Sequence, residues 1–103
     1  MHACPQRLGE EQVVCYTPVD SRHRHTGATR HVVAGVLASQ SCGLAICESP
    51  RSAGFMLYGC DTQWSVLSDT WHPSLAEALA QAEHEYAGSS QTWVYYGREQ
   101  AKA

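Results

Sequence analysis

The sequence predicts a single small α+β domain, in which an antiparallel meander of three or four strands packs against one amphipathic helix at about residues 74–87. A chain of 103 residues is long enough for one domain and too short for two. Its 44% of hydrophobic residues allow a modest core, and several short apolar runs precede a helical repeat. We expect one domain over residues 1–103, with a compact core at 31–96 and an irregular or flexible segment at 1–30.

The helix has the strongest local signal. Ser74 stands three residues before Glu77, the spacing of a capping box, in which each side chain binds a free backbone N–H. Apolar residues then recur with the helical period at Leu75, Ala78, Leu79, Ala82 and Tyr86. We expect this face to pack on the sheet, with Leu79 and Tyr86 in the core, and Gly88 to end the helix in a left-handed conformation.

Apolar runs separated by polar breaks predict the strands. They cover residues 12–16, 31–38, 42–48, 55–60, 64–71 and 92–96. The runs at 55–60 and 64–71 predict a hairpin, because the connection between them is short and polar and begins with Asp61. Residues 20–30 are polar and predict an exposed loop.

The charges are unevenly distributed. The formal net charge is −3, yet residues 21–30 carry three arginines and two histidines with no acid. Residues 52–97 carry five acids and no lysine or arginine. A surface of one sign repels nucleic acid and attracts basic partners, so we expect a basic partner protein and no nucleic acid.

The cysteines and the apolar content indicate a reduced, cytoplasmic protein. Five cysteines at irregular spacing, without a CxxC pair, favour free buried thiols over a disulfide or metal framework. No window approaches the roughly 18 apolar residues of a membrane span. The first residues also lack the apolar stretch of a signal peptide, so we expect no membrane association.

Two alternatives to a binding function come from the histidines and acids. His23, His25 and His31 predict a small metal-binding module, although the arginines beside them oppose a bound dication. Asp69 and His72 predict an acid–base pair of a minor enzyme near the helix start, although both types of residue have ordinary structural roles there. The sequence contains no nucleophile elbow, no glycine-rich phosphate loop and no HExxH motif. It therefore favours a protein without enzymatic activity and without a cofactor.

The outward face of the helix is the favoured binding surface. Glu77, Gln81 and Glu85 follow one another at the spacing i, i+4 and i+8, with no lysine to pair with the acids. We expect an acidic docking surface here, with a merely solvated face as the alternative. The other expected contributors lie in the hairpin turn and around the helix start: Asp61, Asp69, Trp71 and His72. Exposed tryptophans among Trp64, Trp71 and Trp93 are the next candidates for an anchor.

The stretch from Gly54 to Trp93 resembles a group of small bacterial α+β domains of unknown function. The shared pattern is W-x-V-x-x-D-T-x-H followed by S-L-x-E-A-x-x-Q-A-E-x-E-Y, in which the last histidine falls on His72 and the last tyrosine on Tyr86. The resemblance covers about 40 residues, fades through 31–48, and implies a bacterial origin without any established activity. The leading hypothesis is a small acidic binding domain, an inhibitor or immunity-type protein, acting as a monomer or small homo-oligomer.

Overall fold

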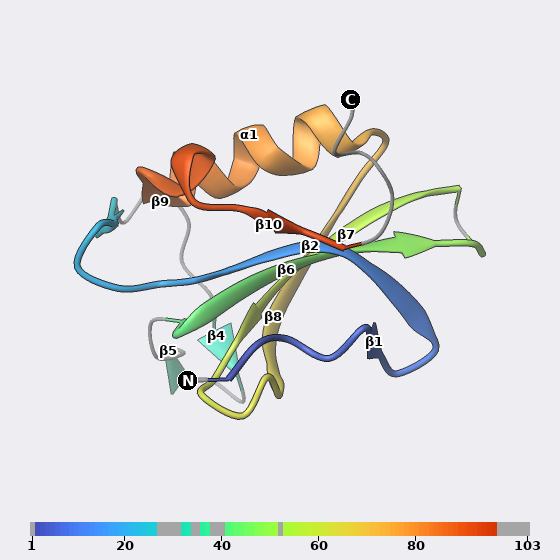
Figure 1. Cartoon of the computed structure of the whole chain (residues 1–103), viewed down its shortest axis with the longest axis horizontal. Helices are drawn as coiled ribbons and strands as arrows, with labels where there is room; N and C mark the ends of the chain where they lie inside the picture. Colours follow the sequence, from blue (N-terminus) through green and yellow to red (C-terminus); the bar gives the residue numbers. More distant parts are fainter. Residues whose placement is uncertain (1, 27–31, 34–35, 38–40, 52, 97–103) are drawn as a thin grey trace.

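The computed structural model of the chain describes residues 2–26, 32–33, 36–37, 41–51 and 53–96. It shows one helix, α1 (Leu75–Glu85), lying over a curled antiparallel sheet (Figure 1). The strand order across the sheet is β1 (Arg7–Leu8), β2 (Glu11–Pro18), β6 (Gly43–Ser49), β7 (Gly54–Cys60) and β8 (Val66–His72). A further strand, β10 (Val94–Tyr95), pairs with the same edge of β2 as β1 does.

The prediction of a three- or four-stranded α+β meander is wrong, because the sheet joins six strands and the fold is mostly β. The first thirty residues, which were expected to be irregular or flexible apart from a short strand at 12–16, form β1 and the longer strand β2, which includes that predicted strand. In β2, Val13, Cys15 and Thr17 are buried and the residues between them are partly exposed. A cysteine and a threonine occupy two of these three core positions, so the alternation typical of a strand is hidden in the sequence.

The segment between β2 and β6 also differs from its prediction. Instead of one strand at 31–38, the chain forms a separate small hairpin of β4 (Val32–Val33) and β5 (Val36–Leu37). The other residues of that predicted strand lie outside the described residues. A second small ladder pairs β3 (Arg24–His25) with β9 (Tyr86–Ala87), which follows the helix directly. The predicted hairpin at 55–60 and 64–71 is confirmed as β7 and β8.

The first core lies between α1 and the sheet. Its buried members are Cys15, Leu44, Ile46, Leu57, Ala78, Ala82 and Tyr86, with Leu75 and Leu79 packed against them. The predicted apolar face of the helix is therefore confirmed. The Ser74 side chain accepts a hydrogen bond from the backbone N–H of Glu77 at 3.1 Å, as the capping pattern predicted. The expected left-handed glycine lies farther on, because α1 ends at Glu85 and Gly88, with φ of 102°, begins the 3₁₀ helix η1 (Ser89–Gln91).

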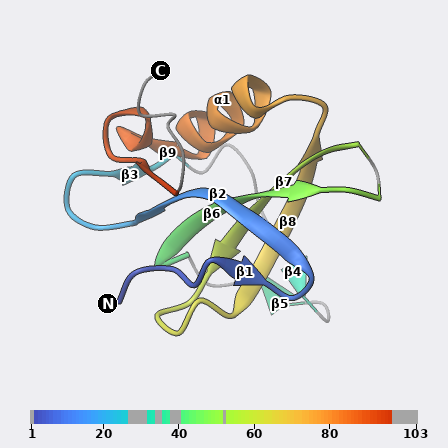
Figure 2. The same cartoon turned by 45° about the vertical axis from the view of Figure 1, so that its right-hand side comes forward.

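The second core lies on the face of the sheet opposite α1, the side along which Figure 2 shows the N-terminal segment running. Its buried members are Cys4, Val13, Ala45, Cys47, Cys60 and Trp64. Residues 2–6 cover it as an N-terminal strap, held by a hydrogen bond from the Trp64 indole to the His2 carbonyl at 2.9 Å. The Tyr96 hydroxyl donates to the Cys4 carbonyl and fixes the same strap. A sheet with both faces covered explains how the described part of so short a chain buries thirteen hydrophobic residues.

Candidate functional site

The residues of the predicted acidic helix face do not form a common surface. Glu77 is exposed on the first turn of α1, whereas Gln81 is half-buried and Glu85 is only 6% exposed. Gln81 Nε2 donates to Glu85 Oε2 at 2.7 Å, so this acid faces the protein interior rather than solvent. The expected row Glu77, Gln81 and Glu85 is therefore wrong, because Glu85 is buried next to Leu44 and Leu57 of the sheet.

Asp61 has a structural contact in the hairpin turn between β7 and β8. Its Oδ1 accepts hydrogen bonds from the backbone N–H groups of Gln63 at 2.8 Å and Ser65 at 2.9 Å. These bonds hold a turn in which Trp64 takes a φ of 63°, a conformation that is unusual for a bulky residue. The turn in this way directs the Trp64 ring into the second core.

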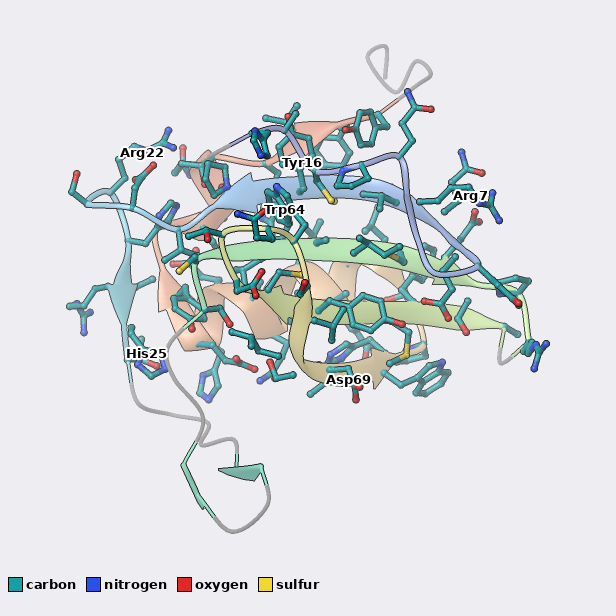
Figure 3. The ribbon with its side chains drawn as sticks, turned by 90° about the horizontal axis from the view of Figure 1, so that it is seen from below. Arg7, Tyr16, Arg22, His25, Trp64 and Asp69 are labelled. Atoms are coloured by element: carbon teal, nitrogen blue, oxygen red, sulfur yellow. The ribbon has the colours of Figure 1, made fainter. Side chains whose placement is uncertain are left out.

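Asp69 and Trp71 lie together on the face of the sheet that α1 leaves uncovered. The register pairs Asp69 with Tyr58 and Trp71 with Met56, and directly paired residues share a face. We call these four residues the β8 patch. Trp71 is 47% exposed and Asp69 is also exposed, while Met56 and Tyr58 are partly exposed. Figure 3 shows Asp69 at the margin of the sheet, far from Tyr16 and Trp64 in the second core.

The Tyr58 side chain reaches away from β8, across the sheet, to a carboxylate on β2. The Tyr58 hydroxyl donates a hydrogen bond to Glu11 Oε1 at 2.6 Å, and the two residues come from strands that are not neighbours in the sheet. Burial and this bond to a carboxylate raise the pKa of Tyr58, so the hydroxyl stays protonated and keeps donating. Sequence reasoning missed Tyr58 and Glu11, since only the strand register brings them together.

The position of Trp71 depends on a glycine in the neighbouring strand. A Cβ atom on Gly54 would lie 2.4 Å from Trp71 Nε1 and 2.6 Å from the His72 carbonyl oxygen. The indole therefore packs directly against the start of β7, where a side chain on residue 54 would push it away. One edge of the ring is fixed on the protein while nearly half of the residue surface remains accessible.

Strand β8 ends the sheet on this side. Within the described residues, its hydrogen-bonded neighbour is β7 alone, so the backbone groups on its outer edge have no strand partner. The strand spans seven residues and contains neither proline nor lysine, the residues that commonly protect an edge from pairing. Asp69 is its only carboxylate.

The residues of the two alternative sites are separated by the fold. Asp69 and His72 point to opposite faces of β8, and His72 Nε2 lies 2.8 Å from Thr70 Oγ1 on the α1 side. They do not form an acid–base pair in this structure.

The histidine cluster is separated as well. His23 has a fully buried side chain whose Nδ1 accepts the Asp20 N–H at 3.0 Å and whose Nε2 lies 2.8 Å from Thr92 Oγ1. His25 stacks on Tyr86 with ring centroids 4.9 Å apart, and His31 lies outside the described residues. No group of three or more potential metal ligands occurs in the described part of the chain.

The cysteines are free thiols at all five positions. Burial raises the pKa of Cys4 to about 11 and the pKa values of Cys15 and Cys60 to about 12, so these thiols are neutral near pH 7. The positive charge of Arg22 is neutralised in part, since Arg22 forms an ion pair with Asp20 at 2.8 Å. That bond from the Arg22 side chain holds the pKa of Asp20 well below its usual range.

Comparisons with protein-family models, curated proteins and solved structures find no match to this chain. The resemblance to small bacterial domains therefore stays a prediction. Across the residues that the structure describes, no helix has the length and apolar character needed to cross a membrane. The β8 patch and the outer edge of β8 are the surface that the geometry favours as a functional site.

Proposed function

We propose that this chain is a small protein-binding domain that accepts an extended, basic segment of a partner protein along the outer edge of β8. One observation carries the proposal: a seven-residue edge strand whose outer side has no partner among the described strands, next to exposed Asp69 and Trp71. Addition of a strand to such an edge is a common mode of peptide recognition, in which backbone hydrogen bonds supply affinity and flanking side chains supply specificity.

The charge of the patch favours a basic occupant. Asp69 lies in the middle of β8 with an exposed carboxylate, whereas Glu11 lies three strands away and is already bound to the Tyr58 hydroxyl. A lysine or arginine on the added strand can lie opposite Asp69, and such cross-strand pairs stabilise a sheet. A second copy of this chain is disfavoured in the two-fold register centred on residue 69, since it would place one Asp69 opposite another.

The aromatic residues supply the apolar part of the contact. Trp71 has few conformations open to it because its ring rests on Gly54, so binding loses little side-chain entropy there. Partly ordered tryptophans of this kind dominate many interfaces, and cationic side chains pack favourably on their faces. Met56 beside it is flexible enough to adapt to different partners.

The test begins with selection of binding peptides from a random displayed library, followed by synthesis of the enriched sequences. We expect enrichment of lysine, arginine and β-branched residues. Amide hydrogen exchange should then slow at those backbone N–H groups of β8 that point away from β7. Protection confined to α1 or to the hairpin tips would contradict the proposal.

Charge reversal locates the contact. Asp69→Lys should lower the affinity for the selected basic peptides by about tenfold or more. At low salt, most of this loss should come from a slower association rate. The matched control is Glu77→Lys, which reverses an exposed acid on α1 and should leave affinity within about twofold at equal net charge. Equal losses from the two variants would show that only the overall charge matters, and the proposed edge site would then be wrong.

A further inference from the structure

A row of five side chains crosses the whole sheet at one end, independently of the β8 patch. The strand registers place these residues opposite one another, one from each of β1, β2, β6, β7 and β8: Arg7, Gln12, Glu48, Phe55 and His72. Neighbouring strands lie about 4.8 Å apart, so the Arg7 and Glu48 backbones are roughly 10 Å apart with Gln12 between them. The order along the row is a cation, an amide, an anion, an aromatic ring and an imidazole.

A cleft of about 450 Å³ follows this row between the tips of the β1–β2 and β6–β7 hairpins. Arg7, Gln12, Glu48 and Phe55 line it, together with Pro50 on the far wall. Its volume falls within the range of pockets that hold small molecules. An ion pair between Arg51 and Glu10 at 3.8 Å links the two hairpin tips.

Only some of the polar groups in the cleft already have a hydrogen-bond partner among the described residues. Arg7 donates from Nη2 to the Glu10 carbonyl oxygen at 2.7 Å, which fixes the guanidinium and leaves its other donors for a ligand. Within the described part of the chain, the side chains of Glu48 and Gln12 have no hydrogen-bond or ion-pair partner. Phe55 provides an apolar wall next to Glu48.

We propose that this cleft binds a small zwitterion with an apolar side chain, of the chemical class of a free α-amino acid. Arg7 binds the carboxylate through paired N–H donors, a geometry that guanidinium groups favour. Glu48 binds the ammonium group, Gln12 bridges the two charged groups, and Phe55 and Pro50 contact the apolar side chain. The proposal does not depend on the function proposed for β8, because the two sites share none of these residues.

The experiment is a titration of the ¹⁵N-labelled protein with L-methionine, followed by amide chemical shifts. We expect saturable shifts at residues 12, 48, 49 and 53–55 with a millimolar or tighter dissociation constant, as suits so few ligand atoms. N-acetyl-L-methionine lacks the ammonium charge and L-methionine methyl ester lacks the carboxylate. Each should bind at least about tenfold more weakly, because each leaves one charged group of the cleft without its partner.

Two variants test the individual residues. Glu48→Gln and Arg7→Gln should each lower the affinity for L-methionine by about tenfold or more. The control Glu77→Gln removes a charge from the exposed start of α1 and should not change binding. The absence of saturable shifts, equal binding of either derivative, or unchanged affinity in Glu48→Gln would each overturn the proposal.

Discussion

Glu83 illustrates how a surface acid can have a structural contact that its sequence position does not suggest. Its Oε2 accepts the backbone N–H of Gly88 at 2.9 Å and its Oε1 accepts that of Ser90 at 2.9 Å. The carboxylate thus caps the chain where η1 begins, several residues farther along. These two hydrogen bonds lower the pKa of Glu83, because both are made to the ionised form.

Glu83→Gln should therefore destabilise the fold near pH 7 and matter much less in acid. The folded-state pKa lies below the unfolded value of about 4.3, so the stabilisation is complete above that pH and is lost as the pH falls through the folded pKa. We expect a loss of about 1 kcal/mol at pH 7, small for bonds to a charged group because water reaches the site. Urea denaturation of both proteins at pH 7 and pH 3 measures the difference, and an equal gap at the two pH values would contradict this assignment.

At the scale of elements, the contact between α1 and the sheet depends on two alanines. Ala78 and Ala82 are both 0% exposed, so the helix backbone lies close to the strands beneath it. The apolar period predicted this face correctly, and the helix limits were accurate to about two residues.

Ala82→Leu should destabilise the protein by about 1–3 kcal/mol, because three additional carbon atoms do not fit under the helix without moving it. The matched control is Ala80→Leu on the exposed face, which should change the unfolding free energy by less than about 0.5 kcal/mol. Chemical denaturation of the two variants gives the comparison. Similar midpoints would mean that α1 does not approach the sheet as closely as the structure indicates.

The strands were harder to predict than the helix for a physical reason. A buried helical face repeats over several turns, but both faces of this sheet are covered, so β6 reads as a continuous apolar run without alternation. Registers also depend on pairing across the whole fold. The sequence therefore pointed to Asp69 and Trp71 as single candidates, while Tyr58 and Glu11 join them only through β7 and β2. The error at Glu85 arose because residues spaced i and i+8 on a helix differ by about 80° in direction, so Glu85 has turned from the outward side toward the sheet.

At the scale of the whole molecule, the two cores differ in what closes them. A helix covers the first, whereas the second is closed by the N-terminal strap and the Trp64 turn. Tyr16 packs edge-on against Trp64 with ring centroids 5.6 Å apart, which adds to the closure.

Trp64→Phe should open this second core locally. The variant loses the indole bond to the His2 carbonyl, and a bond of about 1 kcal/mol corresponds to about a fivefold change in an opening equilibrium. Alkylation of Cys4 at pH 8 should therefore accelerate several-fold. Cys15 in the first core is the internal control and should react at an unchanged rate, as mass spectrometry of peptides can show. Acceleration of both thiols would indicate global rather than local opening.

The contacts that hold the N-terminal strap can form only late during synthesis of the chain. The first residues leave the ribosome long before Tyr96, whose hydroxyl binds the Cys4 carbonyl and whose N–H binds the Val14 carbonyl at 3.0 Å. Contacts of such long sequence separation form late, because a loop of nearly the whole chain must close first. Until then Cys47 and Cys60 lie on an open sheet face, and Cys4 lies on a strap that is not yet fixed. The growing chain is thus most vulnerable to oxidation and to wrong strand pairing in the interval before its last strand is released.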